Sequence, residues 1–178
     1  MISPHILKGL CVLAFLWAVT PLVYGENTFT QTCRETLSTT WQEGRLELLV
    51  PVRTWHNRTR FSHEQIARYN EDPWGIGLAK TYVDDRSHRH RLFALTFQDS
   101  HDKPEPTMGY SWQVQWRADS TVRPTLGLLA GITFRDDYHW IPIPAVLPVA
   151  GLDIGPFSVE STYIIIGEVL FTWVTWRF

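Results

Sequence analysis

Cysteine is scarce in this sequence: its 178 residues contain two, and one of them, Cys11, lies in an apolar N-terminal segment. Several disulfides therefore cannot hold the fold together, and a small disulfide-stapled domain is excluded. An excess of charge of one sign is also missing, because 16 Lys and Arg residues face 18 Asp and Glu residues and the net charge is −2. We therefore expect neither a nucleic-acid partner nor a basic membrane-binding face.

Long apolar runs are missing beyond the N-terminus. A membrane helix needs about 20 apolar residues, and no stretch after Gly25 is that long. Lipid offers no partner to unpaired backbone N–H and C=O groups, so the remaining way to span a membrane is a closed β-barrel. If this chain spans a membrane, it must do so as a barrel.

The N-terminus is interpreted as a signal peptide covering residues 1–25. Lys8 stands before the apolar run "LCVLAFLWAV", and small residues precede Glu26, as in an export signal with its cleavage site. A signal anchor is the alternative, but the apolar run is short for a membrane span. We expect cleavage near Gly25/Glu26, which leaves a mature chain of 26–178.

Aromatic residues are abundant, with nine Trp, nine Phe and six Tyr. Such a content is typical of the aromatic girdles at the two interfaces of a membrane barrel. In "MGYSWQVQWR" (108–117) large residues alternate with small or polar ones, which predicts a strand with two unlike faces. The large residues would face the core of a soluble sandwich but the lipid around a membrane barrel. The alternating final segment, which ends in the aromatic Phe178, favours the barrel.

One segment, 27–43, is predicted to be a helix. Phe29, Cys33, Leu37 and Trp41 recur every four residues and form one apolar stripe. Asn and Thr residues at its start are suitable N-caps. An amphipathic helix of this kind can pack on a soluble core or lie at a membrane interface.

After this helix the sequence alternates between predicted strands and turns. Eight segments have the features of strands, each near the ~9–11 residues that a tilted membrane strand needs. They are 46–57, 74–84, 90–99, 107–117, 124–134, 145–154, 157–166 and 168–178. We expect an all-β fold, an eight-stranded antiparallel transmembrane β-barrel over 46–178, preceded by the amphipathic helix. A barrel of eight strands has an interior that side chains fill or that holds one small ligand.

Several longer motifs follow one another along the chain: "TWHNR" (54–58), "RYNEDPWG" (68–75), "LFALTFQDS" (92–100), "EPTMGYSW" (105–112) and "IPIPAVLPVA" (141–150). Together with "RETLSTTWQ" (34–42), they resemble the PagP family of outer-membrane lipid A palmitoyltransferases in order and spacing. The resemblance covers essentially the whole mature chain. It implies a monomeric outer-membrane enzyme that moves a palmitoyl chain from a glycerophospholipid donor to a hydroxyacyl chain of lipid A. It implies neither a metal nor an organic cofactor.

The resemblance places the family's functional His, Asp and Ser on His56, Asp99 and Ser100. These residue types suit acyl transfer, because a histidine can take the proton of an attacking hydroxyl and a carboxylate can orient and balance the imidazolium. We expect His56 to be the general base and Asp99 to orient it. Ser100 is either a nucleophile or an oxyanion donor. Neighbours on a strand point to opposite faces, so Asp99 and Ser100 suit a strand end that runs into a rim loop.

Ser111 stands where the family has a glycine at the floor of its acyl pocket. A side chain there takes space from the end of the acyl chain, and each buried methylene is worth ~0.8 kcal/mol. The preferred acyl chain is then palmitoyl or slightly shorter. The alternative is that small backbone shifts absorb the hydroxymethyl group.

Three prolines mark expected lateral openings for lipid, because proline lacks the N–H that a strand ladder needs. Pro51 and Pro148 match family positions at one gap in the barrel wall, and Pro73 matches one half of a second gap. Ile165 replaces the proline of the other half. The second gap is therefore closed, displaced or held open by Pro73 alone.

Trp41 and Arg135 match a family pair that clamps the helix to the barrel; the alternative is an interfacial Trp and an unrelated rim Arg. No metal site is expected, since "HRH" (88–90) has no third ligand placed nearby. Two other functions compete with catalysis. A purely structural barrel would have no need of His56 and its partners, and a soluble lipocalin-like lipid carrier would bury its Trp-rich strand face.

Overall fold

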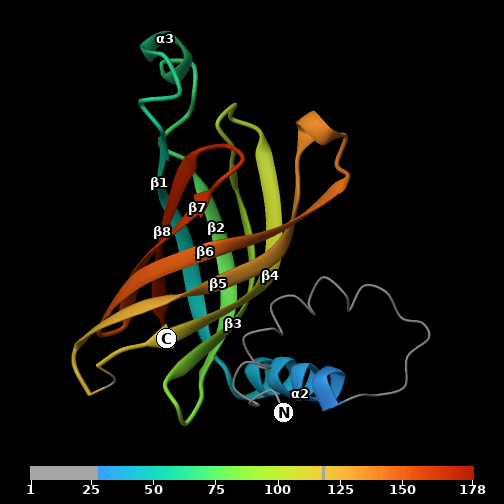
Figure 1. Ribbon diagram of the computed structural model, residues 1–178, viewed down its shortest axis with the longest axis vertical. Coiled ribbons are helices and arrows are strands. Elements are labelled where there is room, and N and C mark those ends of the chain that lie inside the picture. The colour runs from blue at the N-terminus through green and yellow to red at the C-terminus, as the bar shows by residue number, and fades with distance from the viewer. Residues whose placement is uncertain (1–27, 118) are drawn as a thin grey trace.

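The computed structural model describes residues 28–117 and 119–178, and the expected signal peptide with its cleavage site lies outside the described residues. Eight strands form a closed barrel in which neighbours in sequence pair antiparallel and β8 closes on β1 (Figure 1). The elements are α2 (Thr28–Glu43), β1 (Arg45–His56), α3 (His63–Ile66), β2 (Gly75–Val83), β3 (His88–Gln98), β4 (Pro104–Gln115), β5 (Val122–Phe134), η1 (Asp136–Tyr138), β6 (Pro142–Ile154), β7 (Phe157–Ile164) and β8 (Val169–Arg177).

The structure confirms the predicted fold and all eight strands. Strand ends differ from the predicted ones by three residues or fewer. The largest differences are the early starts of β4 at Pro104 and of β6 at Pro142, which pair with Gln98 and Phe134. Their prolines suggested turns in the sequence. A proline lacks only its own N–H, however, and the residues between the prolines continue the ladder.

The two ends of the barrel carry different connections. One end, the helix rim, carries α2 and the turns after β2, β4 and β6. The other end, the loop rim, carries the connections after β1, β3, β5 and β7, among them the longest one, 57–74. Membrane barrels have short periplasmic turns and longer extracellular loops, so the loop rim corresponds to the outer end. Within the described residues, neither α-helix is long and apolar enough to cross a membrane.

The alternating segment 108–117 faces as a membrane barrel requires. Ser111, Gln113 and Gln115 are buried inside the barrel, whereas Met108 and Trp116 on the other face are 43% and 47% exposed. Large apolar residues therefore point outward and polar ones inward. This arrangement contradicts the lipocalin-like carrier, which would bury its Trp-rich face.

Exposed aromatic side chains gather at both ends of the barrel. At the loop rim they are Trp55, Trp74, Tyr138 and Trp140. At the helix rim they are Trp41, Trp116, Phe157, Trp176 and Phe178. Two such belts at the ends of an apolar outer wall match the interfacial girdles of outer-membrane barrels.

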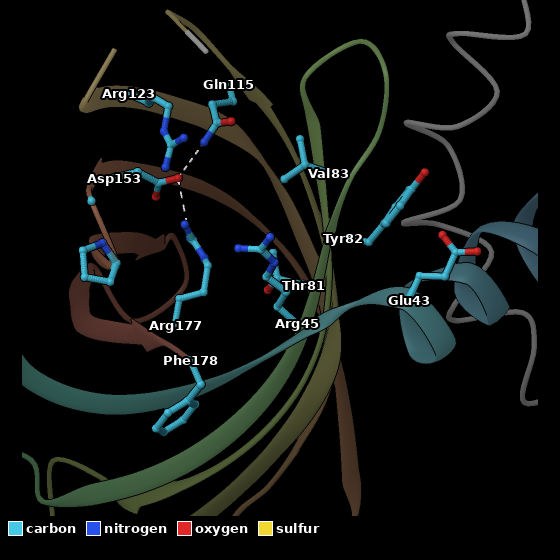
Figure 2. Close-up of a pocket in the computed structure, with 12 residues that line it drawn as sticks. Glu43, Arg45, Thr81, Tyr82, Val83, Gln115, Arg123, Asp153, Arg177 and Phe178 are labelled. Carbon is cyan, nitrogen blue, oxygen red and sulfur yellow. Dashed lines mark hydrogen bonds and ion pairs between the residues drawn. The ribbon is translucent and has the colours of Figure 1, made fainter. Parts of the chain in front are cut away.

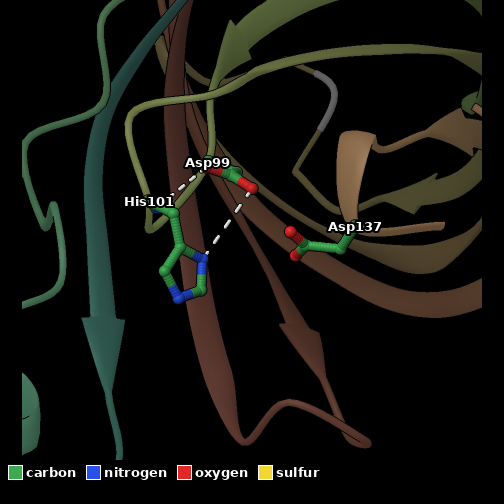
Figure 3. Close-up of side chains that lie close together, drawn as sticks. All are labelled: Asp99, His101 and Asp137. Atoms are coloured by element: carbon green, nitrogen blue, oxygen red, sulfur yellow. Dashed lines mark hydrogen bonds and ion pairs between the residues drawn. The ribbon is translucent and has the colours of Figure 1, made fainter. Parts of the chain in front are cut away.

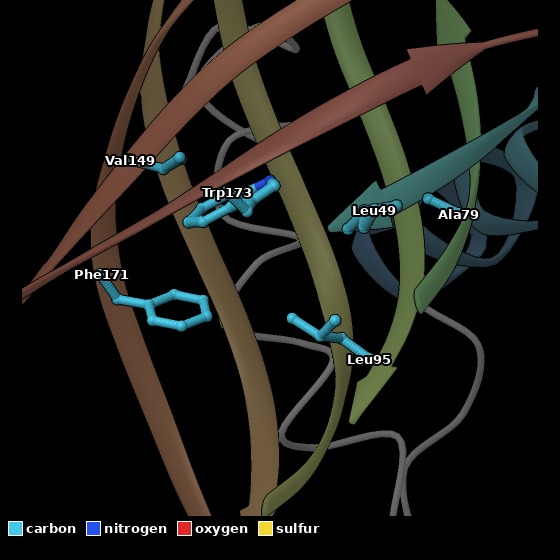
Figure 4. Close-up of a cluster of buried hydrophobic side chains, with 6 residues drawn as sticks. All are labelled: Leu49, Ala79, Leu95, Val149, Phe171 and Trp173. Carbon is cyan, nitrogen blue, oxygen red and sulfur yellow. The ribbon is translucent and has the colours of Figure 1, made fainter. Parts of the chain in front are cut away.

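The interior has two halves of different chemistry. Toward the loop rim it is apolar, with Leu49, Ala79, Leu95, Val149, Phe171 and Trp173 in one buried cluster (Figure 4). Toward the helix rim it is charged. There Arg89 of β3 reaches Asp153 of β6 at 2.6 Å, and Arg91 reaches Glu47 of β1 at 2.7 Å. Because these bonds cross from strand to distant strand, the polar network fills the cross-section beneath the apolar half.

Helix α2 packs against the outside of the barrel over β2 and β3. Cys33 on this helix is buried, and Leu37 packs against the buried pair Tyr110 of β4 and Ala130 of β5. Trp41 is 64% exposed, so the prediction of one continuous stripe is wrong at this end. Four residues advance a helix by about 400°, and a stripe with that spacing turns away from the barrel by about 40° at each step. The side chain of Phe29 lies outside the described part of the chain.

The passage from α2 into β1 depends on Gly44. Its N–H donates to the Thr40 carbonyl at 3.1 Å. A Cβ atom at this position would lie 2.2 Å from the same oxygen, far inside van der Waals contact. Glycine therefore allows the tight turn that connects the helix to the barrel.

Candidate active site

A histidine, a serine and a glutamate meet at the loop rim. His56 ends β1 and its side chain is nearly completely buried, while Ser100 follows β3. The His56 Nε2 atom lies 2.9 Å from the Ser100 hydroxyl oxygen. On the other side of the ring, Nδ1 lies 3.1 Å from an oxygen of Glu71 in the loop 57–74. His56 and Ser100, which we predicted to share a site, thus lie within hydrogen-bond distance of each other.

A short stretch of the loop, residues 69–71, holds the two partners together. The Tyr69 ring stacks on the His56 ring with 4.6 Å between centroids. The Asn70 N–H donates to the Ser100 carbonyl, and the Thr54 N–H on β1 donates to the Glu71 carbonyl, both at 2.9 Å. The stretch thus bridges the end of β1 and the turn after β3.

The loop returns to the barrel because α3 reverses its direction. Ser62 caps this one-turn helix, accepting a hydrogen bond from the Gln65 N–H, and the Gln65 side chain accepts one from the Ser62 N–H. This reciprocal capping box satisfies two backbone donors that a helix start leaves free. The chain then runs back toward β2 and places residues 69–71 over His56.

The charge on Glu71 determines which nitrogen of His56 carries the proton. Arg58 donates to both oxygens of Glu71 at 2.7 and 2.5 Å, and these hydrogen bonds lower the pKa of Glu71 to about 2. An ionised carboxylate only accepts hydrogen bonds, so Nδ1 must be the donor to it. In the neutral ring Nε2 is then an acceptor, and the Ser100 hydroxyl donates to it.

Asp99 does not take the place that we expected for it. Its carboxylate accepts the backbone N–H groups of His101 and Lys103 at 2.8 and 2.9 Å and a side-chain nitrogen of Arg135 at 3.3 Å. Among the described residues, the carboxylate hydrogen-bonded to the ring of His56 is that of Glu71. Asp99 instead stabilises the turn that carries Ser100.

Sequence reasoning missed Glu71. It lies in "RYNEDPWG", one of the motifs that carried the family resemblance, and is acidic. Nothing in its spacing from His56 indicated a contact, because Glu71 lies 15 positions further along the chain, within a loop. The available signal was an acidic residue inside a matched motif near a strand start.

A second cluster at the loop rim joins Asp99, His101 and Asp137 (Figure 3). One possible ligand atom from each lies within 4.8 Å of the others. Arg135 already supplies the positive charge here, at 3.3 Å from Asp99 and 3.2 Å from Asp137. The contacts are those of an arginine between two carboxylates.

Comparison with known proteins places this geometry in a family. The sequence model of the family described as "Antimicrobial peptide resistance and lipid A acylation protein PagP" matches residues 36–175. The chain belongs to the PagP family. The match runs from within α2 to β8 and includes His56, Glu71 and Ser100.

Curated relatives in the PagP family resemble the chain over most of its length. The "Lipid A acyltransferase PagP" of Laribacter hongkongensis is 42% identical over 84% of this chain and 74% of its own. The protein of the same name from Salmonella paratyphi C is 39% identical over 95% and 92%. The "Lipid A palmitoyltransferase PagP" of Escherichia coli O6:K15:H31 is 40% identical over 83% of each chain.

In this PagP-family barrel, Ser111 lies at the boundary between the two halves of the interior. Its side chain is buried inside the barrel. Its neighbour on β3 is Arg91 of the charged network, and its neighbour on β5 is Leu129, which packs on the apolar cluster. This is where the charged half begins beneath the apolar half.

The ladder shows two interruptions in the outer half of the barrel wall. Among the described residues, the β1–β2 pairing extends no further outward than Leu49 with Gly77. The β6–β7 pairing likewise ends at Val149 with Thr162, although Ile165 stands in place of a proline. The Thr162 hydroxyl donates to the Pro148 carbonyl at 2.7 Å beside this second end.

The expected grouping of the prolines was wrong. Pro51 lies on β1 and Pro148 on β6, which are not neighbours in the barrel, so they cannot flank one gap. Pro51 and Pro73 lie beside the β1–β2 interruption, and Pro148 lies beside the β6–β7 interruption. The motifs that carried the resemblance do not by themselves say which strands are neighbours.

The expected clamp between Trp41 and Arg135 is also not present. Trp41 lies on α2 at the helix rim, with the Lys80 ammonium 5.8 Å from its ring centroid. Arg135 follows β5 at the loop rim, beside Asp99. The two residues stand at opposite ends of the barrel.

The helix rim has a polar hollow of its own (Figure 2). It is lined by Glu43, Arg45, Thr81, Tyr82, Val83, Gln115, Arg123, Asp153, Gly155, Pro156, Arg177 and Phe178. Within it, Asp153 accepts a hydrogen bond from Gln115 at 2.6 Å and pairs with Arg177 at 3.7 Å. The hollow is thus the open face of the charged network that fills this half of the barrel.

Proposed function

We propose that this member of the PagP family is a lipid A acyltransferase of the outer membrane. It moves a palmitoyl or slightly shorter chain from a glycerophospholipid to a hydroxyacyl chain of lipid A. The observation that carries the proposal is the His56–Ser100 pair, which stands at the rim directly above an apolar interior. A purely structural barrel has no need of such a pair.

His56 acts as the general base. An acceptor hydroxyl oxygen attacks the carbonyl carbon of the donor ester while His56 Nε2 takes its proton. The tetrahedral intermediate then breaks its bond to the glycerol oxygen, which receives the proton from the imidazolium. The products are an acylated acceptor and a lysophospholipid, so atoms and charge balance.

Ser100 serves this step in one of two ways. As a nucleophile it carries the acyl group first, and the lipid A hydroxyl removes it in a second, identical step. As a hydrogen-bond donor it stabilises the oxyanion while His56 activates lipid A directly. Rapid quenching followed by intact-protein mass spectrometry distinguishes them, because only the first route adds an acyl mass at Ser100. Asp99 supports either route by holding the turn that carries Ser100.

The remaining parts of the proposal concern the substrates and location. The donor chain lies along the apolar cluster with its end toward Ser111. Lipids enter through the wall beside Pro51 and Pro73 or beside Pro148. The mature protein begins near Glu26 and works as a monomer, which N-terminal sequencing and light scattering in detergent would test.

The experiment that tests the function is mass spectrometry of lipid A after incubation with the refolded protein and mixed-chain phospholipids. We expect one added acyl chain, which is lost with His56→Ala. A folded wild-type barrel that adds no chain under these conditions would refute the transferase and leave the structural barrel as its replacement.

A further inference from the structure

We propose that Glu71 is a positioning residue for His56, fixing its ring in the orientation and tautomer that acyl transfer needs. The inference rests on the proposed function and deepens it. It assigns to a loop glutamate the part that the neighbouring Asp99 was expected to play.

Three residues, Glu71, Tyr69 and Phe61, hold the ring of His56 in place. One oxygen of Glu71 accepts both the His56 backbone N–H and Nδ1–H, each at 3.1 Å. Tyr69 stacks on one face of the ring, and Phe61 meets it edge-on at 5.8 Å between centroids. The ring can therefore neither turn over nor exchange its nitrogens without breaking these contacts. Nε2 remains pointed at Ser100.

The same carboxylate is suited to the imidazolium that forms during transfer. Glu71 is largely buried, and Arg58 keeps it ionised by donating to both of its oxygens. When His56 takes a proton, a negative charge is already in place at Nδ1. In Ser-His-Asp triads, a buried carboxylate stabilises the protonated histidine in the same way and is not itself protonated.

A merely structural ion pair in the loop is the competing explanation, and the chain offers a matched control for it. Glu168 accepts from Arg60 at 2.7 Å and from Asn57 at 3.1 Å, and so ties down the same loop. In the described part of the chain, the Glu168 carboxylate bonds to these two residues and not to His56. Glu168→Gln therefore removes a loop carboxylate charge without touching the base.

The experiment compares the wild type, Glu71→Gln, Glu71→Ala and Glu168→Gln. Each is refolded, checked for its folded form by heat-dependent gel mobility, and assayed with a dipalmitoyl glycerophospholipid and lipid A. In parallel, ¹⁵N NMR of ¹⁵N-histidine-labelled protein reports which nitrogen of His56 is protonated. The resonances are assigned by their loss in His56→Gln.

We expect Glu71→Ala to lower kcat by about 100-fold or more with little change in KM, because wrong tautomers and orientations do not transfer protons. Glu168→Gln should stay within about threefold of the wild type. The Nδ1–H tautomer should dominate in the wild type and become mixed in Glu71→Ala. Glu71→Gln, which keeps an acceptor oxygen, should retain the tautomer but lose turnover.

Two results would overturn the inference. One is a folded Glu71→Ala protein with wild-type turnover; the other is an unchanged tautomer in that variant. If the wild type itself transfers no acyl chain, the proposed function fails, and the NMR comparison still decides whether Glu71 orients His56.

Discussion

Arg91 on β3 and Glu160 on β7 form a two-bond ion pair across the interior of the barrel. The Arg91 Nη1 atom lies 2.7 and 2.6 Å from the two oxygens of Glu160, and both side chains are buried. Arg89 lies 2.8 Å from the same carboxylate. Glu160 thus balances two buried arginines at once.

Removal of this carboxylate should be costly. Glu160→Ala leaves two buried guanidinium groups short of a partner, and we expect unfolding free energy to fall by about 3–5 kcal/mol. Urea unfolding of the refolded barrel in lipid vesicles measures it. Glu64→Ala, which removes an exposed carboxylate on α3, is the control and should stay within about 0.5 kcal/mol. A loss of under about 1 kcal/mol for Glu160→Ala would mean that water reaches the network.

The loop 57–74 should detach from the barrel only when the pH falls well below 4.5. The pKa of Glu71 is lowered from 4.5 to about 2 by its hydrogen bonds to Arg58. Stability from a carboxylate with a lowered pKa is fully present above the ordinary value and is lost as the pH falls through the lowered one. We expect hydrogen-exchange protection of this loop to persist at pH 4.5 and to disappear toward pH 2.

The variant Arg58→Ala tests whether Arg58 causes this pH dependence. Without the guanidinium the pKa of Glu71 should return toward its ordinary value, and protection of the loop should be lost nearer pH 4.5. An identical pH midpoint in the variant and the wild type would show that Glu71 does not control the docking of the loop.

The residue at position 111 should influence acyl-chain length. Ser111 stands where the apolar half of the interior meets Arg91, so Ser111→Gly adds room at the end of the chain. We expect the product profile to shift to longer chains, by about fourfold in preference per added methylene. Mass spectrometry of lipid A with mixed-chain donors measures it, with Ser158→Ala, a buried serine of β7, as control. An unchanged profile would mean that the backbone absorbs the hydroxymethyl group.

The attachment of α2 should depend on Leu37 and hardly on Trp41. Leu37 packs against Tyr110, so Leu37→Ala should lower the unfolding free energy by about 2 kcal/mol. Trp41 is mostly exposed, and Trp41→Ala should change it by about 0.5 kcal/mol or less. Urea unfolding in detergent compares the two. A larger effect of Trp41→Ala would mean that the Trp41 ring anchors the helix through Lys80 despite its exposure.

The parts of the fold that follow from local pattern were predictable. The alternation of 108–117 gave both the strand and its inward face, because period two fixes which residues share a side. Prolines blurred the strand starts at Pro104 and Pro142, where backbone pairing outweighs a missing donor. The position of Trp41 was wrong because the prediction left out the rotation of about 40° per step that a four-residue spacing gives the stripe.

The candidate site was predictable only in part. His56 and Ser100 were found through motifs, and the barrel register brings them together across 44 residues. Glu71 lies in one of those motifs too, but its contact with His56 depends on a loop that leaves the barrel, turns at α3 and returns. Likewise, the partners of Pro51 and Pro148 follow from strand order, which no single segment encodes.

The charged half of the interior, the lower half toward the helix rim, closes the barrel at that end, so the barrel is not an open channel. Its wall is interrupted only in the upper half, as far as the described ladder shows, and side chains bonded across the lower half fill its width. Under the proposed function, we therefore expect a lipid to approach His56 sideways through the upper half of the wall and not along the interior from the helix rim. On that proposal, the orientation of the protein in its membrane decides which leaflet supplies the acyl donor.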